Sequence, residues 1–360
     1  MATDRGALAP SRPLVGRVGR VRGRSVWLGI GGLAALVVAL VLGIGLGTVA
    51  IPPNQTLAIL AQHLFGVDLG VAFAPGTDAI VWDLRVPRVL TAMIVGTGLA
   101  VAGATFQGLL RNPLADPYVL GSASGAALGA AIAVLLPVRI VFLQFGLLQA
   151  FAFVGALLAV LAVYRLSQIG GLSPMTSLLL TGYAIGSLLA AGLAMAMYLS
   201  GAALRQIFNY LLGGFDRASW DLLIGTLPII VVGSVLILVR SRALNGMLLG
   251  EEAAAHLGVN VRRERAILLT LASLVTAAAV SISGLIGFVG LVVPHVVRLL
   301  VGPNARLVLP LSAIGGAVLL VYADIAARLL GDIPVGIVTA VIGAPFFLAL
   351  LRRTRAGYEL

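Results

Sequence analysis

The chain has 360 residues, of which 60% are hydrophobic and only 10% are charged, whereas about a quarter of the residues in a typical soluble domain are charged. Its net charge is +11, every basic residue is an arginine, and cysteine is absent. This composition excludes disulfides, thiolate metal sites and a phosphate-binding loop, which needs a lysine. Nucleic acid is not expected as a partner, because the arginines are spread over loops between apolar runs and form no basic domain.

The chain begins with an arginine-rich segment, residues 1–25, which we predict to be a cytoplasmic tail. The apolar run that follows, from residue 26 to about 51, is too long for the roughly 7–15-residue core of a signal peptide. It therefore predicts a retained first span.

Ten apolar runs, separated by Gly, Pro or charged residues, predict ten membrane-spanning helices, since a span needs roughly 20 apolar residues. The predicted spans cover about residues 26–49, 86–110, 118–137, 144–164, 177–199, 222–240, 266–283, 288–301, 308–327 and 334–351. The eighth is short, and residues 283–287 before it predict a bend or a re-entrant piece. The fold class is an all-α polytopic membrane protein, with one ten-helix domain over residues 26–353 and a short cytoplasmic tail over 354–360.

Arginine placement predicts the orientation, because cytoplasmic loops of membrane proteins are enriched in basic residues. With both termini inside, most arginines lie on the cytoplasmic side. The outer side then holds Arg85, Arg88, Arg139, Arg205, Arg217 and Arg328. We therefore predict a multi-pass protein of the inner (plasma) membrane with cytoplasmic N- and C-termini.

Glycine recurs every four residues in the third predicted span, at Gly121, Gly125 and Gly129. Small residues at this spacing let helix backbones approach closely in lipid. We expect this face to pack against a neighbouring helix.

Two prolines four residues apart, Pro113 and Pro117, separate the second and third spans. Proline forbids a continuous helix across this segment, and Asn112 and Asp116 can cap the freed backbone groups. The pattern predicts a tight turn between two helices at the inner membrane face, a place that also suits a constriction.

The longest inner loop covers residues 241–265. Within it, residues 250–258 predict a short helix, with Glu251 and Glu252 in the first turn, where acids favour the helix dipole, and Gly258 as the stop. A helix this short is marginal alone. Either the bilayer surface or a partner protein must hold it.

Ionisable residues within the spans are few. Asp324 and Arg328, four residues apart, predict an ion pair on one helix face. His295 in the eighth span predicts a hydrogen-bonded packing residue, and His63 and His256 stand alone in predicted loops. None of these residues has metal-ligand spacing or a nucleophile–base arrangement, so we expect no catalytic site and no metal site.

Several motifs, in a fixed order from about residue 51 to 353, resemble the FecCD family of ABC importer permeases. They cover residues 84–88, 107–121, 249–254, 287–295, 323–324, 333–336 and 343–347. The resemblance implies the type II ABC importer permease fold with ten spans. It also implies a second permease subunit (the same chain or a close homologue), two cytoplasmic ATPase subunits and a periplasmic or lipid-anchored substrate-binding protein. This chain would bind no cofactor itself, since the partner ATPase uses ATP and Mg²⁺.

The resemblance also assigns roles to residues. The segment that couples to the ATPase would be Leu249, Gly250, Glu251, Glu252, Ala253, Ala254, His256, Leu257 and Gly258. Asn112, Pro113 and Leu114 would form a cytoplasmic gate with Thr176 from the loop before the fifth span. Arg85, Arg88 and Arg328 match outer positions that receive glutamates of the binding protein in the family's vitamin B12 permease.

Members of the family carry ferric siderophores, haem or vitamin B12. We expect a ferric siderophore, because such systems are the most numerous; haem or a corrinoid is the alternative, and residues 204–215 are similar to the vitamin B12 permease. A competing class is an ion-coupled secondary transporter. It needs mid-membrane carboxylates or broken helices that bind an ion, and here the charges cluster near the span ends.

Overall fold

The computed structural model describes residues 14–47, 49–136, 141–142, 145–168 and 174–356. Ten helices form the body of the protein. They are α1 (Leu14–Gly45), α4 (Val86–Leu109), α5 (Ser122–Leu135), α6 (Leu147–Ser167), α7 (Pro174–Leu199), α9 (Trp220–Val239), α12 (Val261–Ser283), α13 (Val289–Val301), α14 (Ala305–Leu329) and α15 (Val335–Ala356). We call the end of the bundle at which α1 finishes the outer end, and the opposite one the inner end, after the predicted orientation.

Shorter elements connect these helices. They are α2 (Pro53–Phe65), α3 (Thr77–Ala79), a π-helical turn (Ile80–Arg85), 3-10 turns at Pro117–Leu120 and Gly201–Ala203, α8 (Leu204–Leu212), α10 (Ser241–Leu248) and α11 (Glu251–His256). Two short strands, β1 (Val141–Phe142) and β2 (Phe145–Gly146), pair antiparallel, with Val141 opposite Gly146.

Seven helical stretches in the described part of the chain are long and apolar enough to span a membrane. One of them is the continuous stretch Thr77–Leu109, formed by α3, the π-helical turn and α4. The remaining three apolar stretches are shorter, namely α5, α13 and Val335–Leu350 within α15. These ten elements correspond to the ten predicted runs, so the all-α polytopic fold predicted from hydropathy is confirmed.

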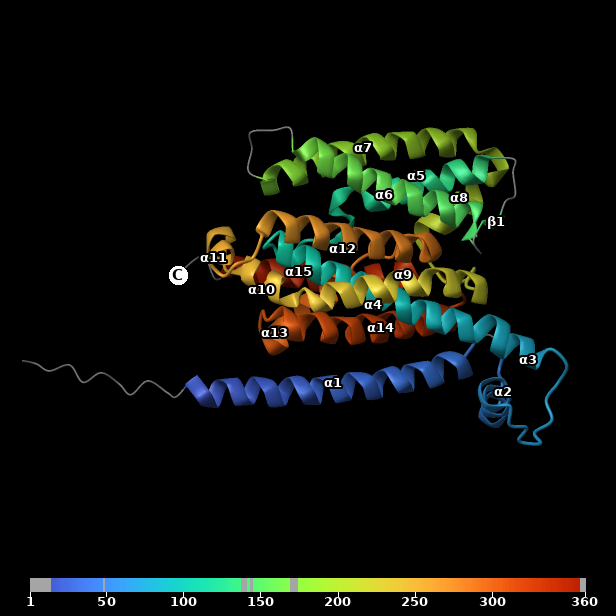
Figure 1. The fold of residues 1–360 in the computed structure, drawn as a ribbon. Coiled ribbons are helices and arrows are strands. Elements are labelled where there is room, and N and C mark those ends of the chain that lie inside the picture. The colour runs from blue at the N-terminus through green and yellow to red at the C-terminus, as the bar shows by residue number, and fades with distance from the viewer. Residues whose placement is uncertain (1–13, 48, 137–140, 143–144, 169–173, 357–360) are drawn as a thin grey trace, which may run out of the picture.

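The spans lie side by side, with α4 in the interior (Figure 1). It packs against α9, α12, α13 and α14, and 83% of the apolar window of its stretch is buried. The group α5, α6 and α7 forms one side of the bundle, and α1 lies along the opposite side against α14. Only 11% of the apolar window of α1 is buried, so this helix is attached along one face.

Glycines bring helix backbones into direct contact. Gly125 and Gly129 of α5 face the carbonyls of Gly155 and Phe151 in α6, and a Cβ at either glycine would overlap the facing carbonyl. The predicted close packing of the third span is confirmed. Gly103 places α4 against α13 in the same way, a contact that no spacing in the sequence had indicated.

The first span differs in detail from the prediction, whereas the bend predicted before the eighth span is confirmed. α1 begins at Leu14, inside the predicted tail, and ends at Gly45. The predicted bend before the eighth span is present, because residues 284–287 are not helical. Gly284 and Phe288, at the two ends of this break, both have positive φ, 67° and 69°.

The second span begins earlier than predicted, at Thr77 instead of residue 86. The predicted span began with the apolar run after Arg85, but the π-helical turn over Ile80–Arg85 joins this run to α3. Pro87 has no N–H to donate to the preceding turn, and the widened turn takes up this irregularity. As a consequence Arg85 lies about 12 Å along the helical stretch from its start, and not at its tip.

Candidate functional site

The inner turn, residues 111–117, follows α4 at the inner end of the bundle. Arg111 has a φ of 46°, and the N–H of Asn112 donates to the carbonyl of Gln107 at 3.1 Å. This is the hydrogen-bond pattern of a Schellman helix end, whose left-handed position is usually a glycine. An arginine in that conformation costs about 1–2 kcal/mol, so other contacts must hold the turn.

Two side chains cap the inner turn as predicted. Oδ1 of Asn112 accepts a hydrogen bond from the N–H of Leu114 at 2.9 Å, and Oδ1 of Asp116 accepts one from Tyr118 at 2.8 Å. Burial raises the pKa of Asp116 to about 6, and the hydrogen bond from Tyr118 opposes this shift. The inner turn is therefore a self-capped structure that holds an acid with a raised pKa.

A polar contact inside the bundle ties the inner end of α4 to α13. Arg298 donates to Oε1 of Gln107 and, at 3.2 Å, to the carbonyl of Ala104. Nε2 of Gln107 donates to the carbonyl of Leu291 at 3.1 Å. The sequence analysis assigned Arg298 to topology alone and missed this link. The available signal was a glutamine within an apolar run, since buried polar side chains in membranes need partners.

The helix predicted in the longest inner loop is present as α11, and a second short helix, α10, precedes it. Gly250 and Gly258, which flank α11, have φ of 117° and 79°, so the predicted glycine stop is confirmed. Ala254 is fully buried, whereas Leu249 and Leu257 are 70% and 65% exposed. These two leucines give α11 an apolar surface that no described part of the chain covers.

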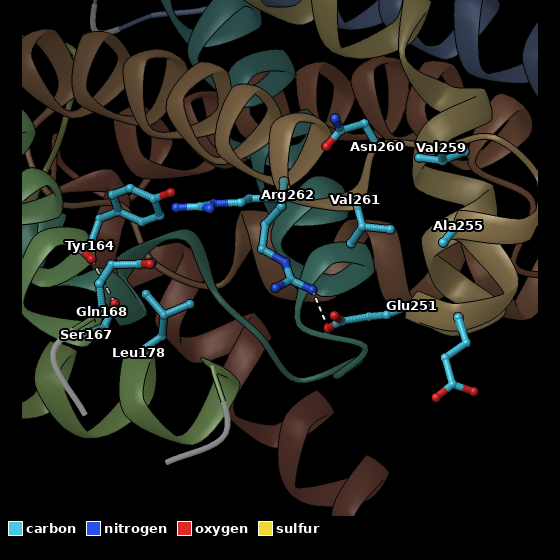
Figure 2. Close-up of a pocket in the computed structure, with 12 residues that line it drawn as sticks. Tyr164, Ser167, Gln168, Leu178, Glu251, Ala255, Val259, Asn260, Val261 and Arg262 are labelled. Carbon is cyan, nitrogen blue, oxygen red and sulfur yellow. Dashed lines mark hydrogen bonds and ion pairs between the residues drawn. The ribbon is translucent and has the colours of Figure 1, made fainter. Parts of the chain in front are cut away.

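Glu251 connects α11 to the inner turn. Its carboxylate pairs with Arg265 of α12, the contact that a dashed line marks at Glu251 in Figure 2, and with Arg111 at 3.6 Å. The neighbouring Glu252 is exposed and forms no ion pair with any residue that the structure describes. The two acids in the first turn of α11 are therefore not equivalent: one holds the inner turn, and the other is available to a partner.

A pocket of about 660 Å³ lies beside this contact. Tyr164, Ser167 and Gln168 from the end of α6 lie on one side of it, and Glu251 and Ala255 of α11 lie on the other (Figure 2). Because its two sides belong to different elements, a displacement of α11 relative to α6 changes the width of this pocket.

The fourth predicted gate residue lies on another element. Thr176 is exposed and belongs to the first turn of α7. Further along α7, Gly182 faces the carbonyl of Val119, in the 3-10 turn that follows the inner turn. Since Gly182 is about 9 Å along the helix from Thr176, α7 contacts the segment after the inner turn and carries Thr176 towards the inner end.

Two of the outer arginines, Arg88 and Arg328, meet at Asp324 in one charged cluster. Arg88 donates to Asp324 at 2.9 Å, although the two residues are 236 positions apart. Asp324 also pairs with Arg328 at 3.1 Å, so the predicted ion pair of these two residues is confirmed. Arg88 further reaches Asp216 at 3.3 Å and Asp332 at 3.7 Å.

Arg85 and Arg328 bind the end of α1. Together they donate at 2.7–3.0 Å to four carbonyls, those of Gly43, Ile44, Gly45 and Leu46. Carbonyls in the last turn of a helix lack helical partners, and a cation is favourable at this end of the helix dipole. The two arginines therefore form a C-terminal cap for α1.

This geometry bears on the predicted docking role of the three arginines. Arg85 and Arg328 are only 6% and 7% exposed, and the side chain of Arg88 is 15% exposed. The exposed members of the cluster are acidic, with side-chain exposures of 70% for Asp216 and 46% for Asp332. Docking through the three arginines stays a prediction, whereas the contacts described here are structural.

Among the described residues, no group of three or more His, Asp or Glu side chains could hold a metal ion. His295 packs edge to face against Phe346, with ring centroids 6.1 Å apart, as expected, but neither of its ring nitrogens has a hydrogen-bond partner among the described residues, so the expected hydrogen bond is not present. His63, which the sequence analysis left isolated, pairs with Asp78 at 2.9 Å; that expectation was wrong because the folded connection between α2 and α3 brings the two residues together.

Comparisons with known proteins cover almost the whole chain. The family model for the FecCD transport family matches residues 35–353. The cobalamin import system permease protein of Halobacterium salinarum is 46% identical over 302 residues, which are 83% of this chain and 79% of that protein. The hemin transport system permease protein of Yersinia pestis is 41% identical over 281 residues, which are 76% of this chain and 84% of that protein.

The likeness extends to three dimensions. The solved structure of a metal-chelate type ABC transporter in an inward-facing conformation is similar over 90% of this chain and 98% of its own, with a TM-score of 0.75 and 30% sequence identity. The arrangement of spans described above is therefore shared with that solved structure.

Proposed function

Because the chain belongs to the FecCD transport family, whose members are permease subunits of ABC importers, we propose that it forms the membrane path of an importer for a corrinoid. ATP hydrolysis in two partner subunits would drive transport across the inner membrane, with both termini of this chain in the cytoplasm. The family assignment sets aside the ion-coupled secondary transporter.

One observation carries the proposal that this chain couples ATP hydrolysis to a gate. Glu251 of α11 holds Arg111 of the inner turn and Arg265 of α12 at the same carboxylate. A partner ATPase that binds the exposed Leu249 and Leu257 would therefore act through one side chain on the turn that contains Asn112, Pro113 and Leu114. The strained φ of Arg111 supports a turn that relaxes once this contact opens.

α7 is the span on which we place the path. Only 11% of its apolar window is buried, and Tyr183, well inside the helix, is 79% exposed. A phenol hydroxyl surrounded by lipid would lack a hydrogen-bond partner. A water-filled path between two permease subunits would provide one, so α7 would lie near the axis of a dimer with Thr176 at its inner mouth.

The outer end would receive the substrate-binding protein. Arg88 has the largest exposure of the three outer arginines, and we expect it to meet an acidic side chain of that protein. Arg85 and Arg328 would support this contact from below by fixing the end of α1. Charges at an interface rim act mainly on the association rate and its salt dependence.

The choice of a corrinoid rests on similarity. The relative at 46% identity is named for cobalamin, and the one at 41% for hemin; the sequence expectation of a ferric siderophore is the third candidate. The test is uptake into proteoliposomes that contain the full importer, with ATP in the lumen and the binding protein outside. Preference for haem or a ferric siderophore over cobalamin would refute the corrinoid assignment.

The coupling role is tested by a matched pair of variants in the same complex. Glu251→Gln should retain the ATPase subunits but lower the substrate transported per ATP hydrolysed by about 5-fold or more, the lower end of typical coupling free energies. Glu252→Gln should instead weaken ATPase association by no more than about 5-fold, since exposed ion pairs contribute about 0–1 kcal/mol. Normal coupling in Glu251→Gln would show that the contact with Arg111 transmits nothing.

A further inference from the structure

The connection between α1 and the second span contains a helix, α2, that runs across the bundle instead of along it. Figure 1 looks along the axis of α2, whereas the spans lie in the plane of the picture. α2 contacts the end of α1 and the π-helical turn Ile80–Arg85. In a membrane, this orientation places the axis of α2 close to the bilayer plane, at the outer end of the bundle.

One face of α2 is fixed to the protein. Thr56 and Ile59 are buried, and Ile59 packs in a small core with Val81 and Val86. On the same side, His63 stacks on Trp82, with ring centroids 4.2 Å apart and planes inclined by 11°. These contacts hold α2 in one orientation.

Trp82 is itself anchored by a second tryptophan. Its ring centroid lies 5.0 Å from that of Trp220, whose indole N–H donates to the carbonyl of Trp82 at 2.9 Å. Tryptophans are enriched where a membrane protein crosses from hydrocarbon to head groups. The pair therefore marks the level of the outer membrane interface, and the stack on His63 places α2 at that level.

The opposite face of α2 is apolar and uncovered by the described chain. Leu57, Leu64 and Phe65 are 62%, 60% and 77% exposed, and their spacing of seven and eight residues places them on one side of the helix. The turn after the helix continues this surface with Val67 and Leu69, 48% and 47% exposed. Residues 53–67 contain no Asp, Glu or Arg.

We propose that α2 lies in the head-group region of the outer leaflet, with Leu57, Leu64 and Phe65 inserted among the upper acyl chains. Leu46 and Val49, in the connection between α1 and α2, are also 40% and 50% exposed. An amphipathic helix that is fixed on one face and apolar on the other occupies the interface plane. A soluble binding protein is the other possible occupant. The absence of Asp, Glu and Arg from α2, with Asp68 as the first charged residue after it, argues against that occupant, since protein–protein interfaces have a polar rim.

The chain has no cysteine, so a single introduced cysteine can be labelled without background. Spin labels at Leu64→Cys and Phe65→Cys, in the full chain in phospholipid nanodiscs, report exposure to oxygen, which concentrates in lipid, and to a water-soluble nickel chelate. The matched references are Gln62→Cys, on the polar edge of α2, and Val41→Cys, on the exposed face of α1. All four positions are exposed, so none of the substitutions disturbs the core.

We expect labels at residues 64 and 65 to behave like the label at 41, with oxygen collision rates several times those of the nickel chelate, and the label at 62 to show the reverse. Nickel accessibility at 64 and 65 equal to that at 62 would overturn the proposal. If those two labels are accessible in the nanodisc and become protected only when the cognate binding protein is added, the face is a protein-docking surface and the lipid assignment is wrong.

Discussion

Replacement of Arg328 by methionine should destabilise the protein far more than replacement of an ordinary outer arginine. Arg328 pairs with Asp324, which is fully buried, and it donates to the carbonyls of Gly43 and Leu46 in α1. Removal of one partner of a buried ion pair costs about 3–5 kcal/mol. Arg88 still contacts Asp324 at 2.9 Å and lowers this cost, whereas each unsatisfied carbonyl adds about 1–3 kcal/mol. We therefore expect Arg328→Met to lower the free energy of unfolding by roughly 3–5 kcal/mol.

The measurement is reversible unfolding in mixed micelles, with Arg217→Met as the control. Arg217 is an exposed outer arginine, and its replacement should change the free energy of unfolding by less than about 0.5 kcal/mol. The double variant Asp324→Asn with Arg328→Met also removes the Asp324 carboxylate, which has lost one of its two partners in Arg328→Met. The double variant should therefore be more stable, by about 1–3 kcal/mol, than the sum of the two single effects predicts. Equal stability of Arg328→Met and Arg217→Met would refute the structural role of Arg328 and leave docking of the binding protein as its role.

Two further predictions concern the inner turn and the packing of α5. The pKa of Asp116 in the folded protein is raised to about 6, above its usual 3.8. The contribution of Asp116 to the free energy of unfolding is therefore complete below pH 4 and is lost as the pH rises through 6. Asp116→Asn keeps the cap and should be more stable than wild type by about 1–3 kcal/mol at pH 7.5. The difference should vanish near pH 4 in thermal unfolding, and a constant offset at both pH values would contradict this explanation. Gly125→Ala should cost about 1–3 kcal/mol, because the new Cβ overlaps the carbonyl of Gly155. Gly31→Ala, with open space around the site, should be neutral or slightly stabilising, and equal effects at the two glycines would mean that α5 and α6 separate without cost.

Local sequence patterns predicted the local structure well. Hydropathy placed the ten helices, the two prolines and their capping residues predicted the inner turn, and Gly258 predicted the end of α11. In each case the chemistry that decides the structure lies within a few neighbouring residues. These local patterns are more predictive in a membrane, because every backbone N–H and C=O group of a spanning helix must form its hydrogen bond within that segment.

The sequence predicted less of what depends on distant residues. Arg88 and Asp324 meet across 236 positions, and no periodicity indicates that contact. The start of the second span was misplaced because the apolar run is bounded by the charged Arg85, whereas in the structure the helix continues through Arg85 in a π-helical turn. The pairing of Glu251 with Arg111 was hidden for the same reason, although both residues belong to segments that the sequence had singled out.

The cap on α1 has a consequence for the order in which the protein is made. Synthesis delivers α1 to the bilayer first, and Arg85 of the next span can bind the carbonyls of Ile44 and Gly45 early. The carbonyls of Gly43 and Leu46 receive their donor from Arg328, which lies 285 positions after Gly43. During most of translation α1 therefore lacks half of its cap and its main packing partner α14, and its docking is complete only after α14 has been inserted. The first span to enter the bilayer is therefore among the last to complete its native contacts.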